Sequence, residues 1–174
     1  AGAFHTCGVT TSGAAYCWGA GGLGDGGGSS PTPVPVAGGL TFATLSTSFA
    51  HTCGVTTSGA AYCWGGGAPV AVPGGLTFAA VSAGAGHACG VTTTGAAYCW
   101  GMNTLGELGT GTSTGPEQCD NGNGYSFACS TIPVAVAGGL SFASVTAGYS
   151  HTCGVTTSGV PYCWGNNVHG LLGN

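Results

Sequence analysis

Small apolar and polar residues alternate along one stretch of the chain, and this stretch occurs four times. In its first copy, residues 5–19, the Thr, Val, Tyr and Trp side chains favour the pleated surface of a β-strand. Thr11, Ser12 and Gly13 interrupt the alternation and predict a three-residue hairpin loop, with Gly13 in the left-handed position of a bulge. The pattern therefore predicts four β-hairpins, at residues 5–19, 51–65, 87–101 and 151–165.

The predicted loop also sets the register of each hairpin. In the first copy it places Cys7 opposite Cys17 and Gly8 opposite Tyr16, so the two Cys lie within reach of a disulfide. Gly8 is expected to leave room for the Tyr16 ring. The two Cys share one face of the hairpin, Tyr16 and Trp18 share the other, and both faces carry apolar groups. We expect both faces to be buried between neighbouring hairpins.

A second pattern lies between the hairpins, at residues 33–46, 69–82 and 133–146. Each of these segments begins with Pro and Val, continues through a Gly-Gly pair and ends in an apolar run that contains one Phe. Because Pro is tolerated in a strand only at a sheet edge, each segment predicts a short edge strand, a turn and a second strand. The three Phe are expected core residues: Phe42, Phe78 and Phe142.

Taken in chain order, a Pro-Val strand, a Phe strand and a hairpin make a four-stranded antiparallel meander, the size of a propeller blade. The sequence therefore predicts an all-β chain, a single β-propeller-like repeat array over residues 1–174. The first hairpin would lack two partner strands, which predicts an open or incomplete array: either the chain is part of a longer array or this hairpin presents a bare edge. The predicted parts are a hairpin unit at 1–19, units at 33–65, 69–101 and 133–165, and an inserted disulfide loop at 110–131.

The composition excludes several function classes. Charged residues make up 2 % of the chain, and there is no Lys or Arg to meet nucleic-acid phosphates. The 43 % apolar content is too high for a disordered chain. No apolar run approaches the roughly 20 residues of a membrane span. With so little charge to keep copies apart, self-association is the first behaviour to expect.

The Cys form five regularly spaced pairs, which predict disulfides and an extracellular, oxidising compartment. Zinc is the alternative, because His5, Cys7 and Cys17 would supply three ligands. Zinc sites favour tighter Cys pairs, however, and the hairpin register accounts for the spacing without a metal. The predicted disulfides are Cys7–Cys17, Cys53–Cys63, Cys89–Cys99, Cys119–Cys129 and Cys153–Cys163.

The remaining polar residues predict neither catalysis nor cofactor binding. Residues 120–124 resemble a calcium loop, but the later bidentate Glu is missing, so a tight turn is the preferred interpretation. Glu117 and Asp120 lack the surroundings of a carboxylate pair in an enzyme. We therefore predict a non-enzymatic protein with no metal and no cofactor. The four repeated His are expected to bond backbone carbonyls, and the four repeated Trp to pack between blades rather than stack on sugars.

The repeated residues resemble those of the regulator of chromosome condensation repeat family. The resemblance rests on His-Thr-Cys-Gly-Val-Thr and Gly-Ala-Ala-Tyr-Cys-Trp-Gly, followed by Gly-Glu-Leu-Gly-Thr-Gly at 106–111 or Gly-Leu-Leu-Gly at 170–173, with a similar loop at 23–26. It covers essentially the whole chain, and it is nearer to extracellular bacterial tandem arrays than to the nuclear protein. It implies a β-propeller of four-stranded blades. Members include a nuclear exchange factor for a small GTPase and a secreted inhibitor of β-lactamases.

Two functions follow as hypotheses. The first is a secreted, non-enzymatic structural protein that forms an extracellular fibre or surface assembly by head-to-tail contact of copies. The second is a binding propeller that recognises a protein or glycan through its variable loops, above all residues 101–132. The predicted assembly edge comprises Phe4, Thr6 and Trp18 in the first hairpin and Tyr162 and Leu172 in the last unit.

Overall fold

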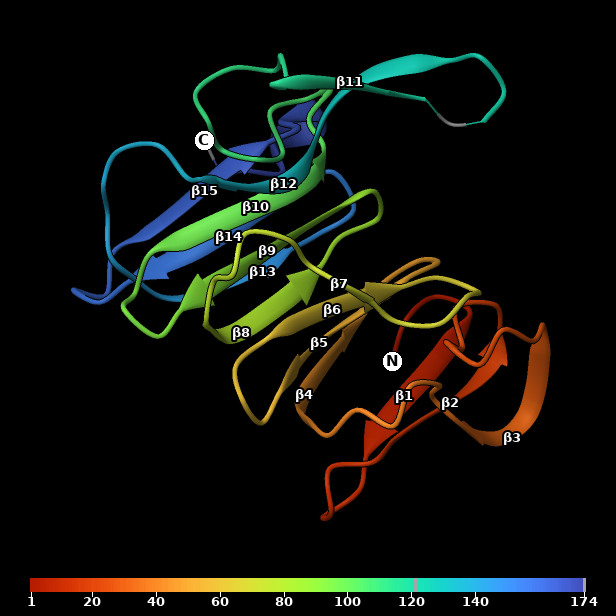
Figure 1. The fold of residues 1–174 in the computed structure, drawn as a ribbon. Coiled ribbons are helices and arrows are strands. Elements are labelled where there is room, and N and C mark those ends of the chain that lie inside the picture. Colours follow the sequence, from red (N-terminus) through yellow and green to blue (C-terminus); the bar gives the residue numbers. More distant parts are fainter. Residues whose placement is uncertain (121, 174) are drawn as a thin grey trace.

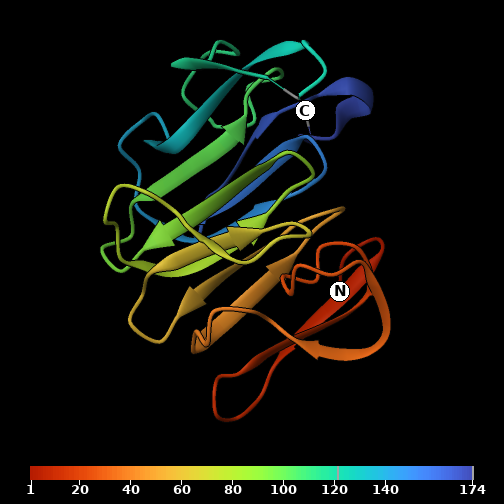
Figure 2. The same cartoon turned by 45° about the vertical axis from the view of Figure 1, so that its right-hand side comes forward.

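The computed structural model describes residues 1–120 and 122–173, and within them the chain forms four small antiparallel sheets that stand side by side as blades (Figures 1 and 2). The predicted all-β, propeller-like fold is confirmed. Blade 1 contains β1 (His5–Val9), β2 (Ala15–Ala20) and β3 (Ser29–Pro35), and blade 2 contains β4 (Phe42–Thr47), β5 (Thr52–Thr56), β6 (Ala61–Trp64) and β7 (Val70–Ala71). Blade 3 contains β8 (Phe78–Ala83), β9 (His87–Thr92), β10 (Ala97–Met102), β11 (Glu117–Asp120) and β12 (Ser126–Ala135). Blade 4 contains β13 (Phe142–Ala147), β14 (His151–Thr156) and β15 (Pro161–Gly165), and the short helix η1 (Val168–Gly170) follows it.

The hairpins have the register that their loops predict. Cys7 pairs with Cys17 and Gly8 with Tyr16, and the other three hairpins repeat this register. The loop glycine has a positive φ in every copy, because the bulge needs a left-handed residue there. The φ values are 85° at Gly13, 86° at Gly59, 86° at Gly95 and 84° at Gly159.

The blade boundaries differ from the predicted units. The Pro-Val strand belongs to the preceding hairpin rather than to the following Phe strand: Val34 pairs with Cys17, Val70 with Cys63 and Val134 with Cys99. The Gly-Gly pair between the two strands does not turn the chain back on itself. Both of its residues have positive φ, 93° and 62° in the first copy, and Phe42 N beyond it bonds the carbonyl of Gly13. The pair therefore carries the chain from the outer edge of one blade into the next. The sheets span residues 5–35, 42–71, 78–135 and 142–165, not 33–65, 69–101 and 133–165.

This assignment of the Pro-Val strands changes which strands the first and last blades lack. The sequence pattern predicts that the first hairpin lacks two partner strands, but in the structure β3 pairs with it. Within the described residues, blade 1 is without a strand beside β1, and blade 4 is without a strand beside β15. Both are consistent with an incomplete propeller.

Each Phe strand fills the face of its own blade. The Phe42 side chain is 2 % exposed and lies over Gly54, where an added Cβ would come within 2.7 Å of the ring. Gly90 and Gly154 stand in the same way beneath Phe78 and Phe142. The repeated hairpin glycine therefore makes room for the Phe of the neighbouring strand. Gly8 was predicted to make room for the Tyr16 ring, but the equivalent glycines of blades 2, 3 and 4 make room for a Phe ring instead.

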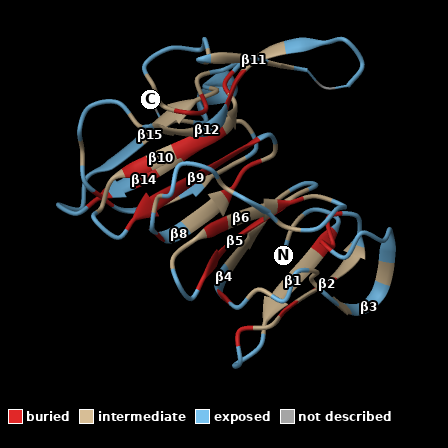
Figure 3. Ribbon diagram, viewed as in Figure 1, coloured by how far each residue is buried: buried red, intermediate tan, exposed pale blue. Residues whose placement is uncertain are grey.

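Neighbouring blades pack face to face in one repeating way. The disulfide face of each blade contacts the Phe-Trp face of the next, as where Cys53 and Val55 of blade 2 pack with Phe78 and Trp100 of blade 3. The inner strands are also tied together, because Ala83 N donates to the Ser46 hydroxyl at 3.0 Å. Figure 3 shows the result: buried residues concentrate in the middle blades, and β3 and the β11–β12 ribbon are mostly exposed.

Candidate functional site

Three exposed aromatic side chains lie together at one end of the blades: Phe4, Phe49 and Tyr149. Their exposed fractions are 55 %, 42 % and 70 %. Each belongs to the turn before the repeated His, and a backbone bond such as Ser48 N to the His51 carbonyl, 2.9 Å, closes the turn. The Phe4 and Phe49 ring centroids are 4.8 Å apart, and those of Phe49 and Tyr149 are 6.0 Å apart, both in T-shaped contact. The three rings form one apolar surface, which we call the aromatic row.

A pocket of about 170 Å³ adjoins the aromatic row. Blade 3 carries Ala85 and Gly86 where the other blades carry an aromatic residue, so a space stays open beside the Phe49 and Tyr149 rings, which contact each other. We call this space the aromatic pocket. Its lining residues are Phe49, Ala85, Gly86, Met102, Glu107, Tyr149 and Ser150.

Glu107 is the one charged residue of this pocket, and its side chain is 2 % exposed. Three hydrogen bonds hold Glu107 in place. Its Oε2 accepts from Leu105 N at 2.8 Å. Its backbone carbonyl accepts from Trp164 Nε1 at 2.9 Å and from the Thr152 hydroxyl at 3.2 Å. Within the described residues Oε1 has no hydrogen-bond partner. The sequence contains no Lys or Arg that could neutralise the carboxylate.

This arrangement suits a cationic group. The Glu107 carboxylate has one hydrogen bond and no ion pair within the described residues, and a cation beside it would stabilise its negative charge. Aromatic walls attract the same cation through the negative faces of their rings. The aromatic pocket therefore combines a fixed negative charge with the side chains that stabilise a positive one.

Of the repeated His, His5 and His87 are buried and bond side-chain hydroxyls instead of the predicted backbone carbonyls, whereas the His51 ring hydrogen-bonds the backbone of His87. His5 Nε2 hydrogen-bonds the Thr52 hydroxyl at 2.7 Å, and His87 Nε2 bonds the Thr152 hydroxyl at 2.8 Å. Because Thr152 donates its one proton to the Glu107 carbonyl, it accepts from His87, which fixes the Nε2–H tautomer. Burial, together with the nearby His51 and His151, lowers the pKa of His87 to about 4.

All five predicted Cys pairs are joined as disulfides: Cys7–Cys17, Cys53–Cys63, Cys89–Cys99, Cys119–Cys129 and Cys153–Cys163. They indicate an oxidising environment for the folded protein. The four hairpin disulfides lie on the blade faces, whereas Cys119–Cys129 joins β11 to β12 in the ribbon. In residues 1–120 and 122–173, no helix has the length and apolar character that crossing a bilayer requires.

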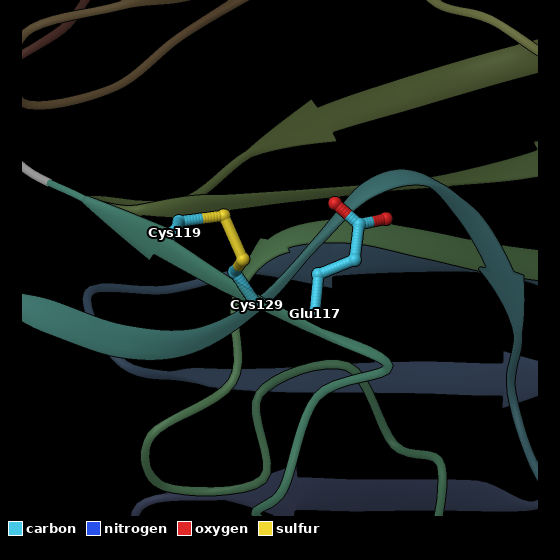
Figure 4. Close-up of side chains that lie close together, drawn as sticks. All are labelled: Glu117, Cys119 and Cys129. Carbon is cyan, nitrogen blue, oxygen red and sulfur yellow. A yellow bond between two sulfur atoms is a disulfide. The ribbon is translucent and has the colours of Figure 1, made fainter.

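One group of potential metal ligands lies in this ribbon: Glu117, Cys119 and Cys129, with ligand atoms within 4.8 Å of one another (Figure 4). Both sulfurs are used in the disulfide, so the carboxylate is the sole ligand that the group offers. That carboxylate is also engaged, because Glu117 Oε2 accepts from the Thr131 hydroxyl at 2.7 Å. The group stabilises the ribbon. Of the calcium-like loop at 120–124, Asn121 lies outside the described residues.

The predicted assembly edge is only partly a strand edge. Thr6 lies on β1 and Tyr162, 44 % exposed, lies on β15, and both strands are unpaired on one side within the described residues. Trp18 lies on the middle strand of blade 1, and Leu172 follows η1. Phe4 belongs to the aromatic row instead.

The sequence analysis did not identify Phe49, Tyr149 or Glu107 as site residues. The signal was present in the residues just before each His, which vary from copy to copy while the hairpin stays constant. Variation on a constant scaffold is where binding usually resides. The predicted partner loop at 101–132 does contribute, because it contains both Met102 and Glu107.

Two models of the regulator of chromosome condensation (RCC1) repeat match the chain. One matches residues 1–25, 78–107 and 142–171, and the other matches residues 94–155. No curated protein matches the chain.

Solved structures with the same fold include yeast RCC1 (Prp20), crystallised with bound Kap60, at a TM-score of 0.77 and 20 % identity over 95 % of this chain and 42 % of that one. Human WBSCR16 has a TM-score of 0.77 and 19 % identity over 99 % of this chain and 48 % of that one. The ectodomain of the Physcomitrella patens receptor kinase CR4 has a TM-score of 0.60 and 26 % identity over 94 % of this chain and 39 % of that one. The chain thus spans less than half of each of these structures.

Proposed function

The chain belongs to the regulator of chromosome condensation repeat family, and on this premise we propose that it is a non-enzymatic binding module that takes a Lys or Arg side chain of a partner protein into the aromatic pocket. The observation that carries the proposal is Glu107, a buried carboxylate on a pocket walled by Phe49 and Tyr149. The cation comes from a different protein, because this chain has no Lys or Arg.

The exposed aromatic row supports a protein as the partner. Contiguous exposed aromatic rings mark interaction surfaces, and Tyr and Phe at the centre of such surfaces contribute much of the binding energy. The row gives a partner an apolar surface to cover, and the pocket beside it selects a positive side chain. A fold neighbour, yeast RCC1, was crystallised with a protein partner.

The compartment that we propose is extracellular. The five disulfides support it, and one fold neighbour is a receptor kinase ectodomain. Secretion would also bring the chain together with partners that carry basic surface residues.

The test compares acetyl-Gly-Lys-Gly-amide with acetyl-Gly-norleucine-Gly-amide, which has the same aliphatic stem without the charge. We expect NMR shifts at Phe49, Tyr149 and Glu107 with the Lys peptide only, and weaker shifts at high salt. Glu107→Gln should weaken Lys binding about tenfold, the value of one charge-assisted contact. Tyr125→Ala, which removes an exposed aromatic on the distant ribbon, is the control and should bind like the wild type. Equal binding of both peptides, or full binding by Glu107→Gln, would refute the proposal.

A structural subunit of an extracellular fibre is the second candidate function. The observation that favours it is the low charge of these 174 residues, which contain no Lys to guard a strand edge against pairing with another copy. Head-to-tail contact of such edges propagates into a filament unless it closes. Light scattering and microscopy of concentrated protein, with and without Thr6→Lys, test this route. Filaments that disappear in Thr6→Lys support it, and a protein that never polymerises contradicts it.

A further inference from the structure

Two of the three contacts between blades are filled by a loop that carries a Leu. Leu23, in the loop between β2 and β3 of blade 1, packs with Cys17 and with Trp64 of blade 2, and it is 0 % exposed. Leu108, in the loop between β10 and β11 of blade 3, packs with Cys99 and with Trp164 of blade 4, and it is also 0 % exposed. Each Leu therefore lies between the disulfide of one blade and the Trp of the next.

The contact between blades 2 and 3 has no such loop. Residues 66–68 stand where residues 20–32 and 102–132 stand in the other two copies. A pocket of about 230 Å³ occupies the place of the missing Leu, and we call it the junction pocket. Its lining includes His51, Cys53, Cys63, Ala88, Trp100 and Gly101. These residues correspond by position to the residues that enclose Leu108.

Two polar groups of the junction pocket also lack partners that their counterparts have between blades 3 and 4, although Trp64 Nε1, at the contact filled by Leu23, has no partner among the described residues either. Where Trp164 Nε1 donates to the Glu107 carbonyl, no hydrogen bond of the Trp100 indole is found in the described part of the chain. Ala88 replaces the Thr whose hydroxyl bonds His5 and His87 in the other copies, so His51 has no hydroxyl partner there. The pocket thus offers an apolar floor and an indole N–H donor to an incoming segment.

Residues 170–173 have the fold of the missing loop. Leu108 N donates to Asn103 Oδ1 at 3.0 Å, and Leu172 N donates in the same way to Asn167 Oδ1 at 3.0 Å. The backbone bond that closes the loop is repeated, from Gly109 N to the Gly106 carbonyl at 3.1 Å and from Gly173 N to the Gly170 carbonyl at 3.0 Å. The glycine φ values agree as well: 82° and 67° in the first loop, 70° and 81° in the second.

We propose that the junction pocket binds the loop at residues 170–173 of a second copy, with Leu172 in the position that Leu108 takes between blades 3 and 4. The Leu171 carbonyl then corresponds to the Glu107 carbonyl and accepts from Trp100 Nε1. The loop is already folded, so little conformational entropy is lost when it binds. Within the described residues, Leu171 is 49 % exposed and Leu172 is half-buried.

The contact uses other side chains than Lys binding at the aromatic pocket, although both pockets are lined by Gly86, and it does not pair the β1 or β15 edge. None of the residues named for the junction pocket is charged, and neither is any residue of the loop at 170–173. The binding should therefore change little with salt, unlike the binding of a Lys side chain to Glu107. Donor and acceptor lie on different parts of the chain, so the contact is heterologous and extends beyond a dimer unless the rotation closes.

The experiment is sedimentation velocity of the full chain over a range of concentrations, with two matched variants. Leu172→Asp should abolish self-association, because a carboxylate would have to enter the apolar pocket. Leu171→Glu restores the Gly-Glu-Leu-Gly sequence of the filled loop and should associate like the wild type. Both side chains are accessible, so both variants should fold, and circular dichroism checks this.

A synthetic peptide of residues 166–173 provides a second measurement. It should compete with self-association and change the fluorescence of Trp100, and a Trp100→Phe variant should lose that change. The proposal is wrong if the wild type stays monomeric at high concentration and the peptide does not bind. It is also wrong if Leu172→Asp associates normally while Thr6→Lys does not, which would place the contact at the β1 edge.

Discussion

The contact between blades 3 and 4 and the contact between blades 2 and 3 are built from the same repeated residues, yet one is filled and the other is open. In the first, Leu108 is fully buried, and the Glu107 carbonyl accepts from Trp164 and Thr152. In the second, Trp100 and the Cys53–Cys63 disulfide line a pocket. The two contacts differ in the loop after the Trp-Gly pair and in Ala88, which replaces a Thr.

The comparison shows that the hairpins and the loops have different roles. The hairpins fix the register, the disulfides and the packing faces, and they hardly change between copies. The loops decide whether a blade contact is closed, and the loop after blade 3 also places Glu107 beside the aromatic row. Changes in the loops therefore alter binding without altering the scaffold.

The largest expected effect is at the filled contact. Leu108→Ala should lower the free energy of unfolding by about 3 kcal/mol, because it removes a fully buried side chain and leaves a cavity. Leu172→Ala is the matched control on the accessible loop and should cost well under 1 kcal/mol in the monomer. Urea unfolding of the oxidised proteins measures both. Similar costs for the two variants would mean that the two loops do not differ as described.

Acid should weaken the filled contact through His87. Its pKa is about 4 in the folded protein and about 6.5 when unfolded, so the unfolded chain binds the proton more readily. The stability is complete above pH 6.5 and falls as the pH is lowered towards 4, by up to about 3 kcal/mol from this residue. Unfolding measured from pH 7.5 to 4, with His87→Asn as the control, tests this. An unchanged slope in His87→Asn would assign the acid sensitivity elsewhere.

The smallest effect should come from restoring one missing partner at the open contact. Ala88→Thr places a hydroxyl where Thr52 and Thr152 stand in the other copies, within reach of His51. We expect a gain of about 1 kcal/mol in the free energy of unfolding, the net value of one buried hydrogen bond. Thr152→Ala is the reciprocal change and should cost a similar amount or more. A loss of stability in Ala88→Thr would show that the open contact has adapted to the smaller residue.

Local pattern was enough to predict the hairpins, because loop length and strand alternation fix which residues oppose each other. The facing of Cys7 and Cys17 and the positive φ of Gly13 both follow from three loop residues. The partner of each Pro-Val strand was predicted wrongly, because a Gly-Gly pair allows the chain either to turn back or to cross to the next blade. Only packing between blades decides between these paths.

The candidate site was harder to predict for the same reason. Phe49 and Tyr149 are about a hundred positions apart in the sequence, and they meet because Ala85 and Gly86 leave the space between them open. Glu107 reads as an ordinary loop acid until the backbone of blade 4 is seen to enclose it. Contacts of this kind depend on how the blades are placed, which no single segment encodes.

The most direct test of the difference between the two contacts is to transplant a loop. Residues 20–32, which join β2 to β3 in blade 1 and carry Leu23, would replace residues 66–68 between β6 and β7 of blade 2. We predict that the grafted protein is more stable than the wild type, no longer self-associates in sedimentation velocity, and still binds the Lys peptide at the aromatic pocket. A grafted protein that associates as strongly as the wild type would contradict the proposal that the missing loop leaves a binding site between blades 2 and 3.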